Sequence, residues 1–222
     1  MNIGIKGVLR RIDVFFILYL LFLIICLSLK LIYTREEIYF AVNSRYSEVA
    51  DLFFRFYTNI GDGLFTIAIV VVLILFFSYS KAFLLASSYA VSSLIAQALK
   101  FAFDAPRPKL YFAEHLQNIH FVKDVHIYLV HSFPSGHSVT AFSTAVVLTY
   151  FSRKKAWGMV FFILAVFAGY SRMYLSEHFF EDVVAGSVTG VIVTVLWLSF
   201  IDSKQFLHSP KWQNALLKKR SA

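Results

Sequence analysis

The sequence predicts an all-α protein that crosses a membrane as six helices, because its composition is strongly apolar and its apolar residues form long runs. Hydrophobic residues make up 59% of the 222 residues and the mean hydropathy is +0.68. Soluble domains contain about 45–50% apolar residues, and a helix needs about 20 of them to cross the hydrocarbon core. Candidate runs lie at residues 13–33, 63–80, 82–103, 138–152, 156–171 and 183–201. We therefore expect a single integral membrane domain over residues 1–222.

The first run is interpreted as an uncleaved span. Basic residues precede it, as they do in a signal peptide, but the run is too long for the apolar part of such a peptide and no small-residue cleavage site follows. The runs 138–152 and 156–171 fall near or below the usual spanning length. We expect their helices to extend into the flanking residues.

The segment 34–62, between the first two runs, predicts an amphipathic helix at the outer membrane interface. Apolar residues such as Val49, Leu52 and Phe56 are interleaved with charges there. This helix could cover the entry of a substrate or simply connect two spans. Residues 1–63 then form the first span and the interfacial segment, 64–201 a catalytic core, and 202–222 a basic tail on the anionic cytoplasmic leaflet.

The distribution of charge predicts the orientation. Segments that lie inside, if both termini are cytoplasmic, contain only Asp13 and Asp202 as acids. Their basic residues are Lys6, Arg10, Arg11, Lys81, Arg153, Lys154, Lys155, Lys204, Lys211, Lys218, Lys219 and Arg220. The positive-inside rule favours this topology, so the net charge of +8 does not indicate nucleic-acid binding. Small size and the lack of glycosylation sequons favour a bacterial inner membrane, with the outer face in the periplasm.

Three polar clusters interrupt the apolar sequence, and the count of spans places all of them at the outer face. They are Lys100 with Arg107-Pro108, Pro134-Ser135-Gly136-His137, and Ser171-Arg172 with His178 and Asp182. Charged side chains at the ends of apolar runs are costly unless they pair or serve a site. Three cations, two histidines, hydroxyls and a carboxylate together are suited to attack on a phosphate ester. A lipid-soluble phosphate is the expected substrate.

Several of these residues predict a phosphate-binding site. Ser135 is placed to cap a helix that starts at Gly136, which would leave backbone N–H groups free for an anion. Arginine can bind phosphate oxygens as a planar fork, and lysine acts as a point charge. The predicted phosphate-binding residues are Lys100, Arg107, Ser135, Gly136, Ser171 and Arg172.

The two histidines are the candidate catalytic groups. His178 and Asp182 are four residues apart, so they share a face if the sixth helix begins there, and Asp182 can then orient His178 as a nucleophile. Simple helix capping is the alternative reading. His137 is the expected general acid. No carboxylate cluster offers a cage for magnesium or zinc, so we expect catalysis without metal or other cofactor.

Other polar residues receive no catalytic role. The loop 109–133 contains His115, His120, His126 and His131, whose spacings do not share a helical face, so interfacial histidines are favoured over a zinc site. Glu177 and Glu181 flank His178 in a site for anions, and the simplest expectation is that both face water.

The three clusters resemble the motifs of the type 2 phosphatidic acid phosphatase (PAP2) superfamily, K-x6-RP, PSGH and SR-x5-H-x3-D, and every motif position matches. The resemblance covers about residues 64–201. It implies a six-helix core and a phosphohistidine intermediate, with His178 as nucleophile, Asp182 orienting it and His137 as acid and then base. Lys100, Arg107, Ser135, Gly136 and Arg172 would hold the phosphate.

Within that superfamily the sequence resembles small bacterial envelope enzymes that act on lipid A, undecaprenyl diphosphate or phosphatidylglycerol phosphate. The expected function is hydrolysis of a lipid phosphate monoester or diphosphate, with a lipid A-type glycolipid favoured. Phosphotransfer to a second lipid, and an anionic-lipid transporter or binder, are the alternatives. The motifs contact only the phosphate, so specificity is expected in residues 34–62, 104–133 and 173–181. The sequence leaves the oligomeric state open.

Overall fold

The computed structural model describes residues 4–152 and 154–217, and within these ranges it contains helices and loops but no strand. The basic residues Arg153, Lys218, Lys219 and Arg220, counted above for the orientation, lie outside the described residues. The α-helices are α1 (Gly4–Arg11), α2 (Asp13–Ile32), α3 (Arg35–Asn43), α4 (Glu48–Tyr57), α5 (Gly63–Phe76), α6 (Tyr79–Phe103), α7 (Pro108–Tyr111), α8 (Gly136–Phe151), α9 (Ala156–Tyr174) and α10 (Phe180–Ile201). Short 3-10 helices are η1 (Thr58–Gly61), η2 (Ala113–Asn118) and η3 (Gln205–His208).

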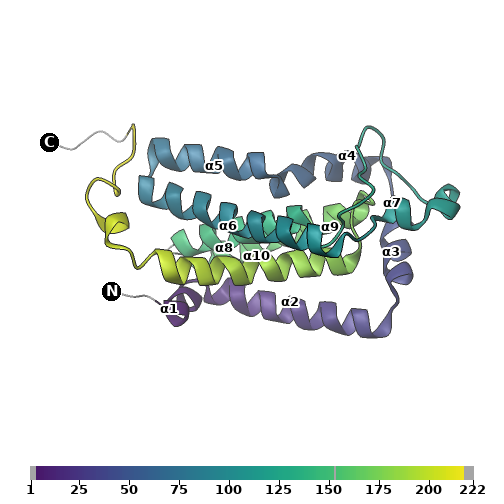
Figure 1. Ribbon diagram of the computed structural model, residues 1–222, viewed down its shortest axis with the longest axis horizontal. Helices are drawn as coiled ribbons and strands as arrows, with labels where there is room; N and C mark the ends of the chain where they lie inside the picture. The colour runs from purple at the N-terminus through teal and green to yellow at the C-terminus, as the bar shows by residue number, and fades with distance from the viewer. Residues whose placement is uncertain (1–3, 153, 218–222) are drawn as a thin grey trace.

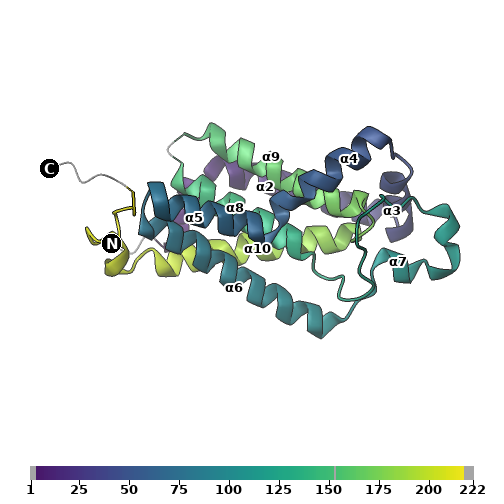
Figure 2. The same cartoon turned by 90° about the horizontal axis from the view of Figure 1, so that it is seen from above.

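The long helices lie side by side in a bundle, with α8 at its centre (Figures 1 and 2). α8 packs against α6, α9 and α10, and 12 of its 16 residues are buried. Its side chains join a core that includes Phe15, Phe142 and Leu198, all fully buried. A helix that is buried all round must be surrounded by other helices. The position of α8 fixes where its first turn, with Ser135 and His137, can lie.

Four helical segments are long and apolar enough to cross a membrane. They are α2, α9, α10 and the segment Tyr79–Tyr111, which contains α6. A fifth is possible if the pair Glu48–Gly61 and Gly63–Phe76, bent by 55°, counts as one span. The second predicted run, 63–80, ends at Phe76 because Ser78 caps the next helix by accepting the Lys81 N–H at 3.2 Å. α8 and α9 extend into the motif residues, as expected from their short apolar runs.

The segment 34–62 forms two helices and a 3-10 turn, where the sequence predicted one amphipathic helix. Thr34 begins α3 with a capping box, in which its side chain accepts the Glu37 N–H and Glu37 accepts the Thr34 N–H. Ser47 then caps α4. The Ser47 cap starts a new helix, so the segment is broken at residues 44–47. α3 runs across one end of the bundle, the end that also carries α7, whereas α1 and η3 lie at the opposite end (Figure 1).

Two glycines bring α10 close to α8. A Cβ atom added at Gly186 would lie 2.5 Å from the Ser135 carbonyl oxygen, and one added at Gly190 would lie 2.6 Å from that of Val139. Neither position has room for a larger residue without a shift of one helix. The Gly186 contact lies directly beneath the residues that begin α8, so it also sets their distance from α10.

Candidate active site

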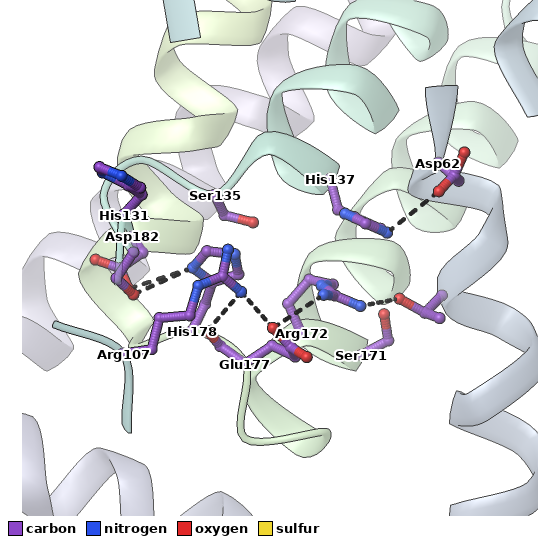
Figure 3. A network of polar contacts seen from close by, with 12 residues as sticks. Asp62, Arg107, His131, Ser135, His137, Ser171, Arg172, Glu177, His178 and Asp182 are labelled. Atoms are coloured by element: carbon purple, nitrogen blue, oxygen red, sulfur yellow. Dashed lines mark hydrogen bonds and ion pairs between the residues drawn. The ribbon is translucent and has the colours of Figure 1, made fainter. Parts of the chain in front are cut away.

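The three polar clusters meet at the end of the bundle that carries α3 and α7, because each lies where a long helix begins or ends (Figure 3). Lys100 is in the last turn of α6 and Arg107 precedes α7. Ser135, Gly136 and His137 begin α8, Ser171 and Arg172 are in the last turn of α9, and His178 and Asp182 lie at the start of α10. The backbone joins them, since the Ser135 N–H donates to the Asp182 carbonyl at 2.9 Å.

The start of α8 has the geometry of an anion cradle. Ser135 is the N-cap and accepts from the Ser138 N–H at 3.4 Å and from the Ser138 hydroxyl at 3.0 Å. Lys100 lies over Gly136, because a Cβ atom added at Gly136 would be 3.7 Å from Lys100 Cε. Lys100 Nζ donates to the His131 carbonyl at 3.1 Å. A lysine ammonium therefore stands beside the positive end of a helix, an arrangement that attracts anions.

Glu177 is buried between the two arginines, so the expectation that it faces water was wrong. Its side chain is 1% exposed, and Oε2 pairs with Arg107 Nη1 and lies 3.5 Å from Arg172 Nη2. Arg107 Nη1 also donates to the Glu177 carbonyl at 3.3 Å. Buried guanidinium groups need a counter-charge, and each of these arginines is only 8% exposed.

The expectation for Glu181 was also wrong. Its side chain is 20% exposed and pairs with Arg35 of α3, and it lies 3.7 Å from Lys30 Nζ of α2. The Arg35 guanidinium also stacks over the Phe179 ring, 4.6 Å from its centroid. Glu181 therefore fastens α2 and α3 to the start of α10, beside the nucleophile candidate.

His178 and Asp182 are paired, but through a helix cap rather than a shared helix face. His178 lies before α10, whose N-cap is Phe179, and Asp182 Oδ2 accepts the Phe179 N–H at 2.9 Å. The same oxygen is 3.4 Å from His178 Nδ1. Ser132, for which no sequence pattern indicated a role, donates to Asp182 Oδ2 at 2.5 Å and lies 3.3 Å from His178 Nδ1. The Nδ1 side of the ring is thus engaged, which leaves Nε2 for substrate.

The surroundings of His178 keep its imidazole neutral. Burial lowers the pKa of His178 well below its usual range, and the positive charges of Arg107, Arg172 and Lys100 act in the same direction. Burial raises the pKa of Glu177, opposed by Arg172 and Arg107. A neutral imidazole has a lone pair available for attack on phosphorus, so the site favours the nucleophilic form of His178.

The remaining predicted residues have different surroundings. The ring of His137 points toward Asp62, with Nε2 3.9 Å from Asp62 Oδ2 (Figure 3). Arg172 Nη1 donates to Thr58 Oγ1 at 2.7 Å. Ser171 is buried and donates to the Ala168 carbonyl within α9 at 2.7 Å, so its contact with phosphate stays a prediction. Asp62 and Thr58 were not singled out from the sequence, because they lie far from the three motifs.

Histidines of the loop 109–133 have separate partners. His120 Nε2 is 2.8 Å from Asp51 Oδ2, and its ring stacks on Tyr46 with centroids 3.9 Å apart. His131 Nδ1 is 3.0 Å from Asp104 Oδ1. These contacts fasten the loop to α4 and to the end of α6. They do not bring the two rings to one point.

A family model described as the PAP2 superfamily matches residues 81–206, more than half of the chain, and the chain belongs to this superfamily. The matched region contains all three motifs. The family predicted from the sequence is therefore confirmed, and the all-α fold agrees with it.

Relatives of the chain are named as phosphatases of different lipids. An undecaprenyl-diphosphatase from Sulfolobus acidocaldarius is 28% identical over 198 residues, 84% of this chain and 88% of that protein. A lipid A 1-phosphatase from Porphyromonas gingivalis is 38% identical over 72 residues, 31% of this chain and 16% of that protein.

Two solved structures are similar. The crystal structure of Aquifex aeolicus LpxE matches with a TM-score of 0.65 and 27% identity, over 74% of this chain and 94% of that one. The crystal structure of a transmembrane PAP2-type phosphatidylglycerolphosphate phosphatase from Bacillus subtilis matches with a TM-score of 0.63, over 89% of this chain and 99% of that one. At 22% identity the second match bears on the fold alone.

Proposed function

We propose that this phosphoric ester hydrolase removes phosphate from a phosphorylated envelope lipid by way of a phosphohistidine on His178. The observation that carries the proposal is a buried imidazole whose Nδ1 side faces Asp182 and Ser132, beside two buried arginines. In the first step His178 Nε2 bonds to phosphorus as the ester oxygen leaves and takes a proton from His137. In the second step His137 accepts a proton from water, the water oxygen bonds to phosphorus, and phosphate leaves His178.

The charge that builds on the phosphoryl oxygens would be stabilised by the residues around them. Lys100, Arg107 and Arg172 supply positive charge, and the start of α8 at Ser135 and Gly136 supplies N–H donors. Three cations placed in this way do what a metal ion does in other phosphatases. We therefore propose a reaction without metal or other cofactor.

The substrate class follows from the relatives and from the site at the end of an apolar bundle. A lipid A-type glycolipid, the substrate favoured by the sequence, is the first candidate. Undecaprenyl diphosphate is the second candidate, because the undecaprenyl-diphosphatase aligns with 84% of the chain. Phosphatidylglycerol phosphate is the third. Transfer of the phosphoryl group to a second lipid would use the same residues and differs only in its products.

For the membrane arrangement we propose one domain with six crossings, by α2, α5, α6, α8, α9 and α10. α5, with 14 residues, is about 21 Å long and would be extended across the bend by η1 and α4. α3 would lie at the outer interface. Basic residues at the α1 end, such as Arg10, Arg11 and Lys154, support cytoplasmic termini and a periplasmic active site in a bacterial inner membrane.

The test is phosphate release by the purified protein in detergent, with excess EDTA, from lipid A, undecaprenyl diphosphate, phosphatidylglycerol phosphate and phosphatidic acid. We expect release from at least one lipid, complete loss in His178→Ala, and full activity in the control His115→Ala, an exposed loop histidine. Substantial activity in His178→Ala would exclude the covalent mechanism. Activity lost in EDTA and restored by magnesium would contradict the metal-free reaction.

A further inference from the structure

The segment 58–62 lies against the two helix ends that carry His137 and Arg172. η1 packs on both α8 and α9. Gly61 allows the closest approach, since a Cβ atom there would lie 3.0 Å from the His137 carbonyl oxygen. The family match begins at residue 81, so it assigns no role to this segment.

Asp62 has a separate contact for each carboxylate oxygen. Oδ1 accepts the Leu64 N–H at 2.7 Å and caps α5, while Oδ2 lies 3.9 Å from His137 Nε2. A separation of 3.9 Å is an ion-pair distance, and contacts of catalytic groups often shorten when substrate binds. Burial opposes a proton on the His137 ring, and so do the positive charges of Arg172, Lys100 and Arg107. The negative charge of the Asp62 carboxylate instead favours a proton on that ring.

Thr58 holds the guanidinium of Arg172, the second site residue in contact with this segment. Its side-chain oxygen accepts from Arg172 Nη1 at 2.7 Å, while Nη2 lies 3.5 Å from Glu177. Among the described residues, Arg172 Nε is buried without a hydrogen-bond partner. The guanidinium is thus fixed through its two terminal nitrogens, which leaves the Nε–H among the N–H groups that can donate to a phosphate oxygen.

We propose that residues 58–62 are a fourth part of the active site, in which Asp62 positions His137 and Thr58 positions Arg172. This inference rests on the proposed hydrolysis. Asp62 would hold Nε2–H of His137, so that Nδ1 delivers the proton to the leaving oxygen, and it would stabilise the imidazolium that forms when His137 takes a proton from water. Neither residue bonds to the substrate.

Asp62 could instead serve only as a helix cap, and Asp62→Asn separates the two roles. Asparagine caps a helix about as well as aspartate but carries no charge. Asp62→Ser is a second variant that keeps a capping oxygen. The matched control is Asp124→Asn, an exposed carboxylate at the same end of the molecule that pairs with Arg55 at 3.0 Å.

The measurement compares kcat/KM for two phosphate monoesters, dodecyl phosphate and p-nitrophenyl phosphate, in detergent. The value of kcat/KM reports the steps up to departure of the leaving group. An alkoxide needs a proton to leave, whereas p-nitrophenolate does not. In Asp62→Asn we expect kcat/KM for dodecyl phosphate to fall roughly tenfold, part of the ~10²–10⁴-fold that a general acid contributes. The value for p-nitrophenyl phosphate should change much less, and the thermal midpoint should match that of Asp124→Asn.

Thr58→Val tests the other half of the proposal, because it keeps the shape of the side chain and removes the hydroxyl. Inhibition by orthophosphate should weaken severalfold, without the selective loss on dodecyl phosphate. The role of Asp62 would be overturned if kcat/KM fell equally for the two esters in both Asp62 variants. It would also be overturned if kcat/KM for dodecyl phosphate did not fall in either variant. Unchanged phosphate inhibition in Thr58→Val would overturn that of Thr58. Wild-type protein that hydrolyses neither ester nor any of the four lipids would instead overturn the proposed function.

Discussion

At the scale of single residues, the site depends on contacts that satisfy its buried charges. Glu177 stands between Arg107 and Arg172, and Asp182 accepts from Ser132 and the Phe179 N–H. A buried charge is tolerated only where it is paired and hydrogen-bonded. The groups proposed to bind phosphate are therefore already fixed by these contacts, which is the condition for stabilising a transition state without reorganisation.

Glu177→Ala should destabilise the protein, because it leaves two buried guanidinium groups without their carboxylate. Removal of one partner of a buried ion pair costs about 3–5 kcal/mol. We expect a lower thermal midpoint in detergent, and orthophosphate should raise that midpoint more than in wild type because the anion replaces the lost charge. Glu114→Ala, an exposed glutamate of the loop 109–133, is the control. A midpoint equal to that of wild type, with or without phosphate, would contradict this account of Glu177.

The sequence predicted which motif residues meet, but not the residues that hold them. His178, His137 and Arg172 could be assigned because their spacing follows a known pattern. Ser132, Thr58 and Asp62 follow no such pattern, and their contacts arise only from the packing of distant segments. Glu177 was expected to face water, because its charge would repel an anionic substrate. Its burial between two cations depends on the fold.

At the scale of helices, capping residues determine where each helix begins and ends, and the apolar runs only show that a helix is present. The predicted runs located the long helices, but their ends follow from caps such as Ser78 and Ser135. The capping-box spacing of Thr34 and Glu37 indicates the start of α3, and Ser47, which precedes acidic residues, indicates the break before α4. Hydrophobicity alone could not reveal it, because the apolar pattern continues through both helices.

Gly186→Ala should disturb the site through helix packing. The added methyl group would meet the Ser135 carbonyl oxygen at 2.5 Å and Ser138 Cβ at 2.8 Å, so α8 must move away from α10 at the anion cradle. Overpacking of this kind costs about 1–3 kcal/mol. We expect a lower thermal midpoint and slower phosphate release.

Gly190→Ala and Ile192→Ala complete that comparison. Gly190→Ala, which meets the Val139 carbonyl further from the cradle, should lower the midpoint with a smaller effect on turnover. Ile192→Ala changes a half-exposed position of the same helix and should leave turnover unchanged. Wild-type turnover in Gly186→Ala would show that the start of α8 does not need this close contact.

At the scale of the whole molecule, the fold brings together residues far apart in the chain by placing helix ends at one face. Lys100, His137 and Arg172 lie on three different helices that pack around a common centre. The sequence could predict this convergence from the order of the apolar runs. It placed the segment 34–62 at this face but left open whether the segment covers the site, because the positions of α3 and η1 depend on contacts such as Arg35 with Glu181 and Thr58 with Arg172.

The central claim is that His178 carries the phosphoryl group during turnover. The most direct measurement is mass spectrometry of protein quenched at alkaline pH, where phosphohistidine survives, during turnover of the lipid that the wild-type protein hydrolyses fastest. The account predicts a phosphoryl group on His178 in wild-type protein. With p-nitrophenyl phosphate, whose leaving group needs no acid, it predicts more of this group in His137→Ala, in which the water that releases phosphate lacks its base. Phosphate on any other residue, or steady turnover with His178 never modified, would contradict it.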